Sequence, residues 1–322
     1  MLQQETGAPM NEPQTADSAG RQRTLRHAIG CVGIGLHSGA RTALTLHPAP
    51  AGHGIRFRRA DRPGTPAMAA RYDNVVDTTL CTTLGLPGGP RIAMVEHVLA
   101  AFAACEIDNA LVDVSGPEIP VMDGSAQPFV FLIECAGVVE QDAERPVIEV
   151  LKRVSVSGEA SWVALEPAPD LVLDCRIEFD NPLIGTQERV HRFRPESFRG
   201  EIAPARTFGF ADAVEELRAR GMALGGSLKN AVVFGHDGVL NEEGLRFRDE
   251  PVRHKILDAV GDLSLAGARI RCRYTARRAG HALTNRVLYA LFADPSAWRV
   301  VGGAIDVVAE GEPVPRTAGA SA

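Results

Sequence analysis

Hydrophobic and polar residues alternate in several short segments of the first half of the chain, and apolar residues recur with helical spacing between them. Alternation is typical of strands, whose successive side chains point to opposite faces of a sheet. It predicts strands at residues 42–47 (TALTLH), 54–59 (GIRFRR) and 109–116 (NALVDVSG). Apolar residues spaced three or four apart predict helices at residues 92–105 (IAMVEHVLAAFAAC) and 126–137 (AQPFVFLIECAG), the second ending at Gly137.

The second half repeats this order of short strands and helices. Strands are expected at residues 161–167 (SWVALEP), 171–179 (LVLDCRIEF) and 189–194 (RVHRFR). Helices are expected at residues 211–221, within 251–267 and at 281–293. Strands and helices of this length in both halves favour an α+β protein.

Residues 138–146 (VVEQDAERP) interrupt the apolar periodicity with charges and a proline. This composition predicts a linker with a domain boundary near Glu144. We therefore expect two similar domains, residues 21–144 and 145–310, each a small mixed sheet packed with helices. No residue-level repeat between the halves supports a duplication.

Neither end of the chain has the pattern of a folded element. Residues 1–20 are polar and lack the basic start and apolar core of a secretory signal, so a disordered leader is expected there. Residues 311–322 are expected to be a disordered tail. Since no stretch reaches the roughly 18 apolar residues that span a bilayer, membrane contact should be peripheral at most.

Composition narrows the class of protein further. The 322 residues, 45% of them hydrophobic, are enough for one large or two ordinary domains. A net charge of -6 from 34 basic and 40 acidic residues, with no long basic run, argues against nucleic-acid binding. Six cysteines without a CxxC pair fit neither a zinc ribbon nor a disulfide-rich secreted scaffold. They indicate reduced thiols in a cytoplasmic protein.

Three polar residues share one face of the helix expected within 251–267. His254, Asp258 and Asp262 are four residues apart and lie within roughly 80° of one another around the helix axis. A catalytic zinc site needs three nitrogen or oxygen ligands and an open position. His254 and Asp258 could supply two ligands and His97 the third, with the adjacent Glu96 activating the attacking water.

Ordinary roles for the same residues remain open on spacing alone. A His-x3-Asp pair is common as an i,i+4 contact, and a lone histidine in an apolar helix, such as His97, is more often a satisfied core residue. His281 stands just ahead of an apolar helix, where capping or surface exposure is the usual role. The hydroxyl of Thr207 could bond an oxyanion or simply make a turn contact.

Several longer motifs together resemble one enzyme family. They are GIGLHSG (33–39), TTLCTTLG (78–85), VEH (95–97), PEIPVMDGSAQPFV (117–130), ARTFGF (205–210), NEEGLRFRDEPVRHKILDAVGDL (241–263) and AGHAL (279–283). In this order they resemble UDP-3-O-acyl-N-acetylglucosamine deacetylase, the zinc enzyme of lipid A synthesis in Gram-negative bacteria. The resemblance runs from about residue 21 to residue 308.

The resemblance implies a role for each matching polar residue. His97, His254 and Asp258 would bind Zn²⁺, and Glu96 would be the general base. His281 would be the acid or the charge stabiliser, oriented by Asp262. Lys255 and Thr207 would complete the polar ring around the reacting amide.

The resemblance also implies a fold and a substrate. Family members have two domains with the active site in the cleft between them, and they bury the substrate's acyl chain in an apolar passage. Leu36, Phe208, Phe210 and Met222 are the expected lining residues here, although ordinary core packing would also explain them. The substrate would be a UDP-linked acylated glucosamine, met by a cytoplasmic monomer. A hydrolase acting on another acylated sugar, or a sugar-nucleotide binding module without catalysis, remain the alternatives.

Overall fold

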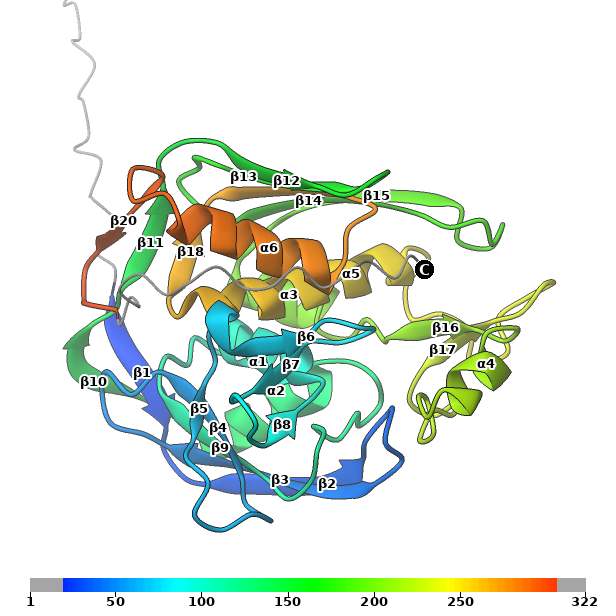
Figure 1. Ribbon diagram of the computed structural model, residues 1–322, viewed down its shortest axis with the longest axis horizontal. Coiled ribbons are helices and arrows are strands. Elements are labelled where there is room, and N and C mark those ends of the chain that lie inside the picture. The colour runs from blue at the N-terminus through cyan, green and yellow to red at the C-terminus, as the bar shows by residue number, and fades with distance from the viewer. Residues whose placement is uncertain (1–19, 306–322) are drawn as a thin grey trace, which may run out of the picture.

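Two five-stranded sheets form the outer layers of the protein, and helices fill the space between them (Figure 1). The computed structural model describes residues 20–305. The expected leader and tail therefore lie outside the described residues, except for Gly20 at the end of the leader. Within the described part, no helix combines the length and the apolar character needed to cross a membrane.

The sheet of the N-terminal half contains the strands expected at 42–47, 54–59 and 109–116. Its strand order is β2 (Ile29–Ile34), β3 (Arg41–Pro48), β9 (Ala110–Val114), β4 (Ile55–Arg59) and β5 (Met68–Ala69). β3 pairs antiparallel with β2 and β9, whereas β4 runs parallel to β9. Leu44 and Leu46 of β3 are buried on one face, as the alternation predicts.

Two helices cover the inner face of this sheet (Figure 1). They are α1 (Val95–Ala104) and α2 (Gln127–Ala136). α2 ends as predicted at Gly137, whose φ of 72° is a conformation that favours glycine. Almost every residue of α1 is buried, because this helix lies in the middle of the molecule.

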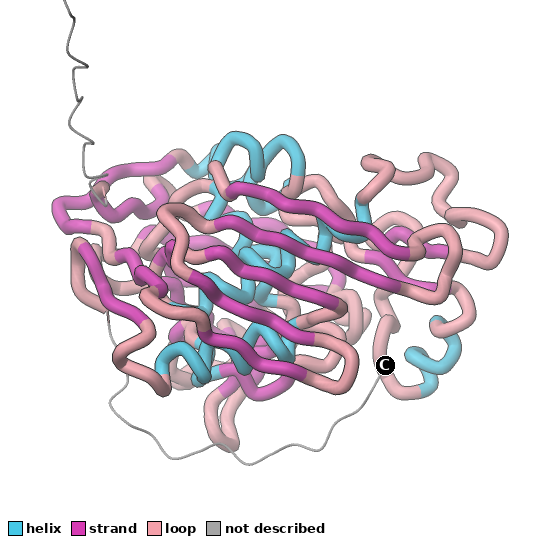
Figure 2. The backbone as a smooth tube through the Cα atoms, turned by 90° about the horizontal axis from the view of Figure 1, so that it is seen from above, coloured by secondary structure: helices cyan, strands magenta, loops and turns pink. Residues whose placement is uncertain are grey.

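Figure 2 shows the sheet of the C-terminal half from above, and like the first sheet it combines antiparallel and parallel strand pairs. Its strand order is β12 (Val154–Ser157), β13 (Trp162–Glu166), β19 (Arg273–Arg277), β14 (Val172–Glu178) and β15 (Thr186–Arg192). Its inner face is covered by α5 (Glu250–Leu263), beside β14 and β15, and α6 (His281–Phe292), beside β12 and β13. The expected helices within 251–267 and at 281–293 are thus confirmed.

The layers are sheet, helices, helices, sheet, and α1 of the first half packs directly against α5 of the second (Figure 1). This arrangement confirms an α+β fold of two similar parts. Since α1 and α5 carry the candidate metal ligands, the packing of the two halves decides the geometry of the site.

The expected linker at 138–146 is wrong, because most of it forms a strand. β10 (Val138–Glu144) pairs antiparallel with β1 (Arg21–Leu25), with Arg21 opposite Glu144. The charges that suggested a linker belong to a two-stranded ribbon whose alternate side chains are solvated. The boundary near Glu144, and with it the division into residues 21–144 and 145–310, stays a prediction.

The remaining elements are short. They are β6 (Val75–Asp77), β7 (Thr83–Gly85), β8 (Arg91–Ile92), β11 (Val147–Val150), β16 (Phe208–Phe210), β17 (Val232–Phe234), β18 (Arg269–Arg271), β20 (Trp298–Val301), α3 (Pro195–Glu201), α4 (Val214–Ala219) and the 3-10 turns η1 (Tyr72–Asn74) and η2 (Ser264–Ala266). β16 and β17 are parallel, and the helix expected at 211–221 is the shorter α4 between them.

Candidate active site

A single glycine allows α1 and α5 to approach closely. A β-carbon on Gly261 of α5 would stand 2.0 Å from the carbonyl oxygen of Glu96 in α1. No side chain fits in that space, so only glycine permits this packing. The approach places Glu96 and His97 of one half beside the polar face of α5.

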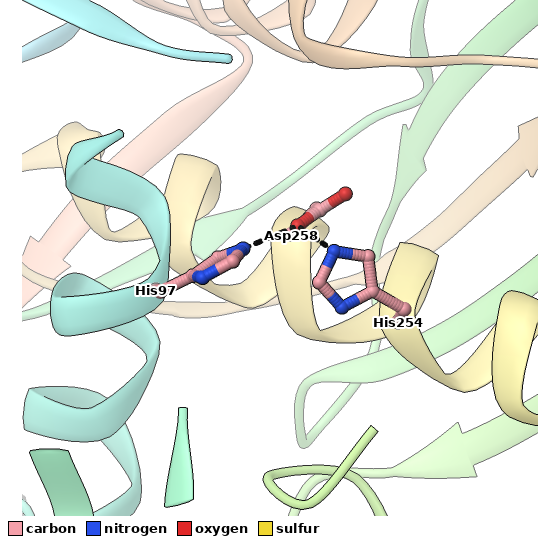
Figure 3. A group of neighbouring side chains, drawn as sticks. All are labelled: His97, His254 and Asp258. Atoms are coloured by element: carbon pink, nitrogen blue, oxygen red, sulfur yellow. Dashed lines mark ion pairs between the residues drawn. The ribbon is translucent and has the colours of Figure 1, made fainter. Parts of the chain in front are cut away.

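Three side chains from these two helices converge (Figure 3). The Nε2 atoms of His97 and His254 lie 3.6 and 3.3 Å from the same carboxylate oxygen, Oδ1 of Asp258. All three ligand atoms lie within 4.8 Å of one another. Two ligands on one tetrahedral zinc ion are about 3.3 Å apart, given metal–ligand distances near 2.0–2.1 Å. The spacing therefore fits a single small cation.

The carboxylate of Asp258 has the partners expected of a metal ligand. Its Oδ2 accepts a hydrogen bond from Nζ of Lys255 at 3.0 Å. Its Oδ1 is buried and has no hydrogen-bond donor among the described residues. Burial opposes its charge, but the ammonium group of Lys255 outweighs burial and holds the pKa of Asp258 well below its usual range. An anionic oxygen left unpaired in a protein interior is costly, and a bound cation would satisfy it.

His254 is oriented by the backbone. Its Nδ1 lies 3.0 Å from the carbonyl oxygen of Ala205, so Nδ1 donates and the Nε2 lone pair faces Asp258. Burial lowers the pKa of His254 to about 3, against the opposing effect of the Asp258 carboxylate. The imidazole is therefore neutral, which is the form that binds a metal ion. The set of two imidazoles and one carboxylate suits zinc and leaves a coordination position open.

The loop that carries the Ala205 carbonyl is itself held by a buried ion pair. Nε and the backbone N–H of Arg206 donate to Oε1 of Glu250 at 2.9 and 3.0 Å. Glu250 is the first residue of α5, so this pair fixes the loop against the helix that supplies His254. Thr207 follows immediately, and its backbone N–H donates to the carbonyl of Gly124 at 2.8 Å.

Glu96 is positioned as a proton acceptor beside the cluster. Its side chain is 1% exposed, and its Oε2 accepts the backbone N–H of Thr82 at 3.0 Å. Burial raises the pKa of Glu96 to about 7, with Asp262 and Asp258 acting in the same direction and His281 and His97 against it. A carboxylate with a pKa near neutrality can both take up and release a proton during catalysis.

His281 and Asp262 form a second pair, as the family resemblance implied. Nδ1 of His281 donates to Oδ2 of Asp262 at 2.8 Å, and Nε2 lies 3.9 Å from Oδ2 of Asp258. Burial disfavours the imidazolium, but the carboxylates of Asp262, Glu96 and Asp258 outweigh it and raise the pKa of His281 to about 9. The ring is thus a cation at neutral pH, with Nε2 toward the metal cluster.

Aromatic rings border the cluster on the side of β16. The Phe208 ring lies 6.3 Å from the His254 ring, and Nζ of Lys255 stands 5.7 Å above Phe208. Phe179 packs on Phe208 and Phe210 at 5.5 and 5.6 Å between ring centroids. The sequence analysis predicted Phe208 and Phe210 as lining residues but not Phe179. Phe179 ends the strand predicted at 171–179, and nothing in the sequence distinguishes it from an ordinary strand residue.

Met222 lies in the loop that follows α4, and the backbone of Leu36 contacts the same loop. The carbonyl of Leu36 accepts the N–H of Gly225 at 3.0 Å, and the N–H of Met222 donates to the carbonyl of Leu217 at 2.8 Å. Both side chains are half-buried. Their role in lining an acyl passage stays a prediction.

Comparison with known proteins shows which family the sequence of this chain matches. A sequence model described as UDP-3-O-acyl N-acetylglycosamine deacetylase matches residues 22–293, which include every site residue above. Proteins named UDP-3-O-acyl-N-acetylglucosamine deacetylase are similar over most of their length. That of Myxococcus xanthus is 47% identical over 284 residues, covering 88% of this chain and 90% of the relative. Those of Neisseria gonorrhoeae and Nitrosococcus oceani are 45% and 48% identical, covering 87% of this chain and 92% and 93% of the relatives.

Proposed function

The chain belongs to the UDP-3-O-acyl N-acetylglycosamine deacetylase family, and we propose that it performs the family's hydrolysis with one zinc ion held between its two halves. The reaction removes the N-acetyl group of UDP-3-O-(3-hydroxyacyl)-N-acetylglucosamine as acetate and leaves a free amine, a step of lipid A biosynthesis. The observation that carries the zinc proposal is the convergence of His97 and His254 on the unpaired Oδ1 of Asp258.

His97, His254 and Asp258 would hold the metal. When bound there, zinc supplies a Lewis acid that polarises the amide carbonyl and makes water a better nucleophile at neutral pH. Asp258 remains anionic because Lys255 donates to its other oxygen. His254 keeps its nitrogen lone pair directed at the site because the Ala205 carbonyl fixes the tautomer.

Glu96 is the general base of the proposed mechanism. It takes the proton of the water that attacks the amide carbonyl carbon, and the carbon–nitrogen bond then breaks. A pKa raised to about 7 by burial suits this task, because the carboxylate is half ionised near neutral pH and a strong enough base to accept the proton.

His281 supplies positive charge and a proton in the proposed mechanism. As an imidazolium paired with Asp262, it stabilises the negative charge that develops on the carbonyl oxygen and can protonate the departing nitrogen. Lys255 and Thr207 complete the polar surroundings. The hydroxyl of Thr207 is proposed to donate to the developing oxyanion.

The aromatic cluster of Phe179, Phe208 and Phe210 supports an apolar passage for the acyl chain. It lies directly beside His254, so a chain bound there would emerge next to the reacting amide. Leu36 and Met222 are proposed to line the same passage. We propose a cytoplasmic monomer that meets its lipid-bearing substrate at the membrane surface without spanning it, and that does not bind nucleic acid.

One paired measurement tests the proposed function. Purified protein should contain about one zinc ion per chain by elemental analysis and should release acetate from the acylated UDP-sugar. A chelator should abolish the release and added zinc should restore it. Protein that binds the sugar nucleotide but releases no acetate would instead be a binding module. Equal rates on amides lacking the nucleotide would indicate a different substrate class.

A further inference from the structure

Thr82 touches both proton-transfer groups of the site. It is 1% exposed and stands just before β7, far in sequence from the helix α5 that it contacts. Its backbone N–H donates to Oε2 of Glu96 at 3.0 Å, and its hydroxyl donates to Oδ1 of Asp262 at 2.6 Å. One residue therefore joins the base from α1 to the carboxylate that pairs with His281.

The hydroxyl contact fixes the plane of the Asp262 carboxylate. Oδ1 accepts from Thr82 and Oδ2 accepts from Nδ1 of His281 at 2.8 Å, so both oxygens are engaged. A carboxylate held through only one oxygen can swing about its terminal torsion, which is broad. Held at both ends, it presents Oδ2 to the imidazole in one orientation. The Thr82 oxygen is also 3.3 Å from Nδ1 of His281, so all three groups lie together.

The backbone around Thr82 is bent to make these contacts. Leu80 and Met94 have φ values of 62° and 63°, a left-handed conformation that is strained for residues other than glycine. Met94 caps α1, and the N–H of Val95 in its first turn donates to the carbonyl of Thr82 at 3.3 Å. This hydrogen bond holds the Thr82 backbone against the start of the helix that carries Glu96.

We propose that Thr82 is a positioning residue for the deacetylation reaction: its N–H orients Glu96, and its hydroxyl holds Asp262 so that His281 is aimed at the reacting amide. This role rests on the proposed function, in which Glu96 and His281 move protons. The hydrogen bond from the hydroxyl to Asp262 can be tested separately from the one that the backbone N–H donates to Glu96, since a side-chain substitution leaves the N–H in place.

Thr82→Val removes the hydroxyl at nearly constant volume, and Thr82→Ser retains it. We expect Thr82→Val to keep its zinc and its KM within about twofold while kcat falls roughly 10- to 100-fold, the range for one hydrogen bond to a charged group. Thr82→Ser should recover most of the activity. The matched control is Thr83→Val, which should behave as wild type because, within residues 20–305, the Thr83 hydroxyl contacts only the Cys81 sulfur, at 3.9 Å.

A double substitution separates positioning from general damage. If Thr82 acts through Asp262, Thr82→Val should cost little more once Asp262→Ala has removed the carboxylate, because residues that act as a unit are not additive. If Thr82→Val does not fold, Thr82→Cys keeps the volume with a weak thiol donor and takes its place. Wild-type kcat in Thr82→Val, no recovery by Thr82→Ser, or an undiminished loss in the Asp262→Ala background would each overturn the proposal.

A spectrum of the substrate-free enzyme distinguishes failure of this inference from failure of the proposed function. In ¹⁵N-labelled, zinc-loaded protein, the Nδ1 proton of His281 is identified by its disappearance in His281→Gln. We expect its resonance to shift in Thr82→Val and to stay in place in Thr83→Val. An unmoved resonance would overturn the positioning role even in an active enzyme. A shifted resonance in a wild-type protein that releases no acetate would support the contact while the proposed function fails.

Discussion

Gly261 of α5 faces the carbonyl oxygen of Glu96 in α1 so closely that a β-carbon there would lie 2.0 Å from that oxygen. The two residues belong to different halves of the protein, and the site lies where they meet. His97 follows Glu96, and Asp258 and Asp262 flank Gly261 on α5. The distance between these two helices therefore sets the distance between the ligands.

Gly261→Ala should force α1 and α5 apart. The added methyl group would meet backbone atoms, which cannot rotate away as a flexible side chain can. We expect a loss of stability of about 1–3 kcal/mol or more from overpacking, together with weaker zinc binding. Thermal unfolding and zinc titration measure both. Gly200→Ala in α3, where a β-carbon would meet nothing within 4 Å, is the control and should be neutral or slightly stabilising. Unchanged zinc affinity in Gly261→Ala would contradict this account.

Metal binding and proton transfer should separate by substitution. His254→Ala removes one of three protein ligands, so zinc occupancy in metal-limited buffer should fall sharply and activity with it. Glu96→Gln should keep its zinc yet lose about 10² to 10⁴ in kcat, the scale of general acid–base catalysis. Elemental analysis beside acetate release distinguishes the two variants. Full zinc occupancy in His254→Ala would contradict the assignment of His254 as a ligand. Loss of zinc in Glu96→Gln would contradict the assignment of Glu96 as a base that does not hold the metal.

The activity should fall at alkaline pH as His281 loses its proton. The carboxylates of Asp262, Glu96 and Asp258 outweigh burial and raise the pKa of this imidazole from 6.5 to about 9. Catalysis that needs the imidazolium is therefore retained below that value and lost above it. Any stability that this cation contributes is likewise lost as the pH rises through it. In Asp262→Asn the alkaline limb of kcat/KM should move to lower pH, and a limb that stays in place would show that another group titrates there.

The aromatic cluster should make activity depend on the acyl chain. Each methylene that the passage buries contributes about 0.8 kcal/mol, so a substrate without the chain should lose several orders of magnitude in kcat/KM. Phe210→Ser should reduce the difference in kcat/KM between the acylated and the unacylated substrate. Phe131→Ser is the control, because Phe131 is 64% exposed on α2. Equal kcat/KM for the two substrates in the wild-type protein would remove the passage from the mechanism.

Periodicity predicts the main helices and strands, whereas the roles of the site residues were predicted from the resemblance to a known family. The helices with the ligands are long and strongly periodic, and the four-residue spacing of His254, Asp258 and Asp262 correctly placed them on one face. The charges and the proline of residues 138–146 predict a linker where the structure has a strand, since the sequence of a two-stranded ribbon with one solvated face resembles that of a polar loop. The short strands β6 to β8 carry too few residues to show a period.

Contacts between distant segments were beyond the reach of sequence patterns. The Ala205 carbonyl that orients His254 leaves no trace in side-chain composition, because it belongs to the backbone. Thr82 belongs to the TTLCTTLG motif (78–85), but the sequence predicts no role for it, since only the folded chain brings its hydroxyl to Asp262. Gly261 lies beside the polar face of α5, but its close approach to Glu96 depends on how the two halves pack.

Because His97 comes from the first half and the other two ligands from the second, neither half can offer a complete site by itself. A cation bound there recognises the assembled state alone, so its binding free energy adds to the free energy that joins the halves. The affinity for the metal ion and the free energy that joins the two halves are therefore thermodynamically linked. A substitution that weakens the contact of α1 with α5 should lower the affinity for the metal ion, and removal of the metal ion should weaken that contact.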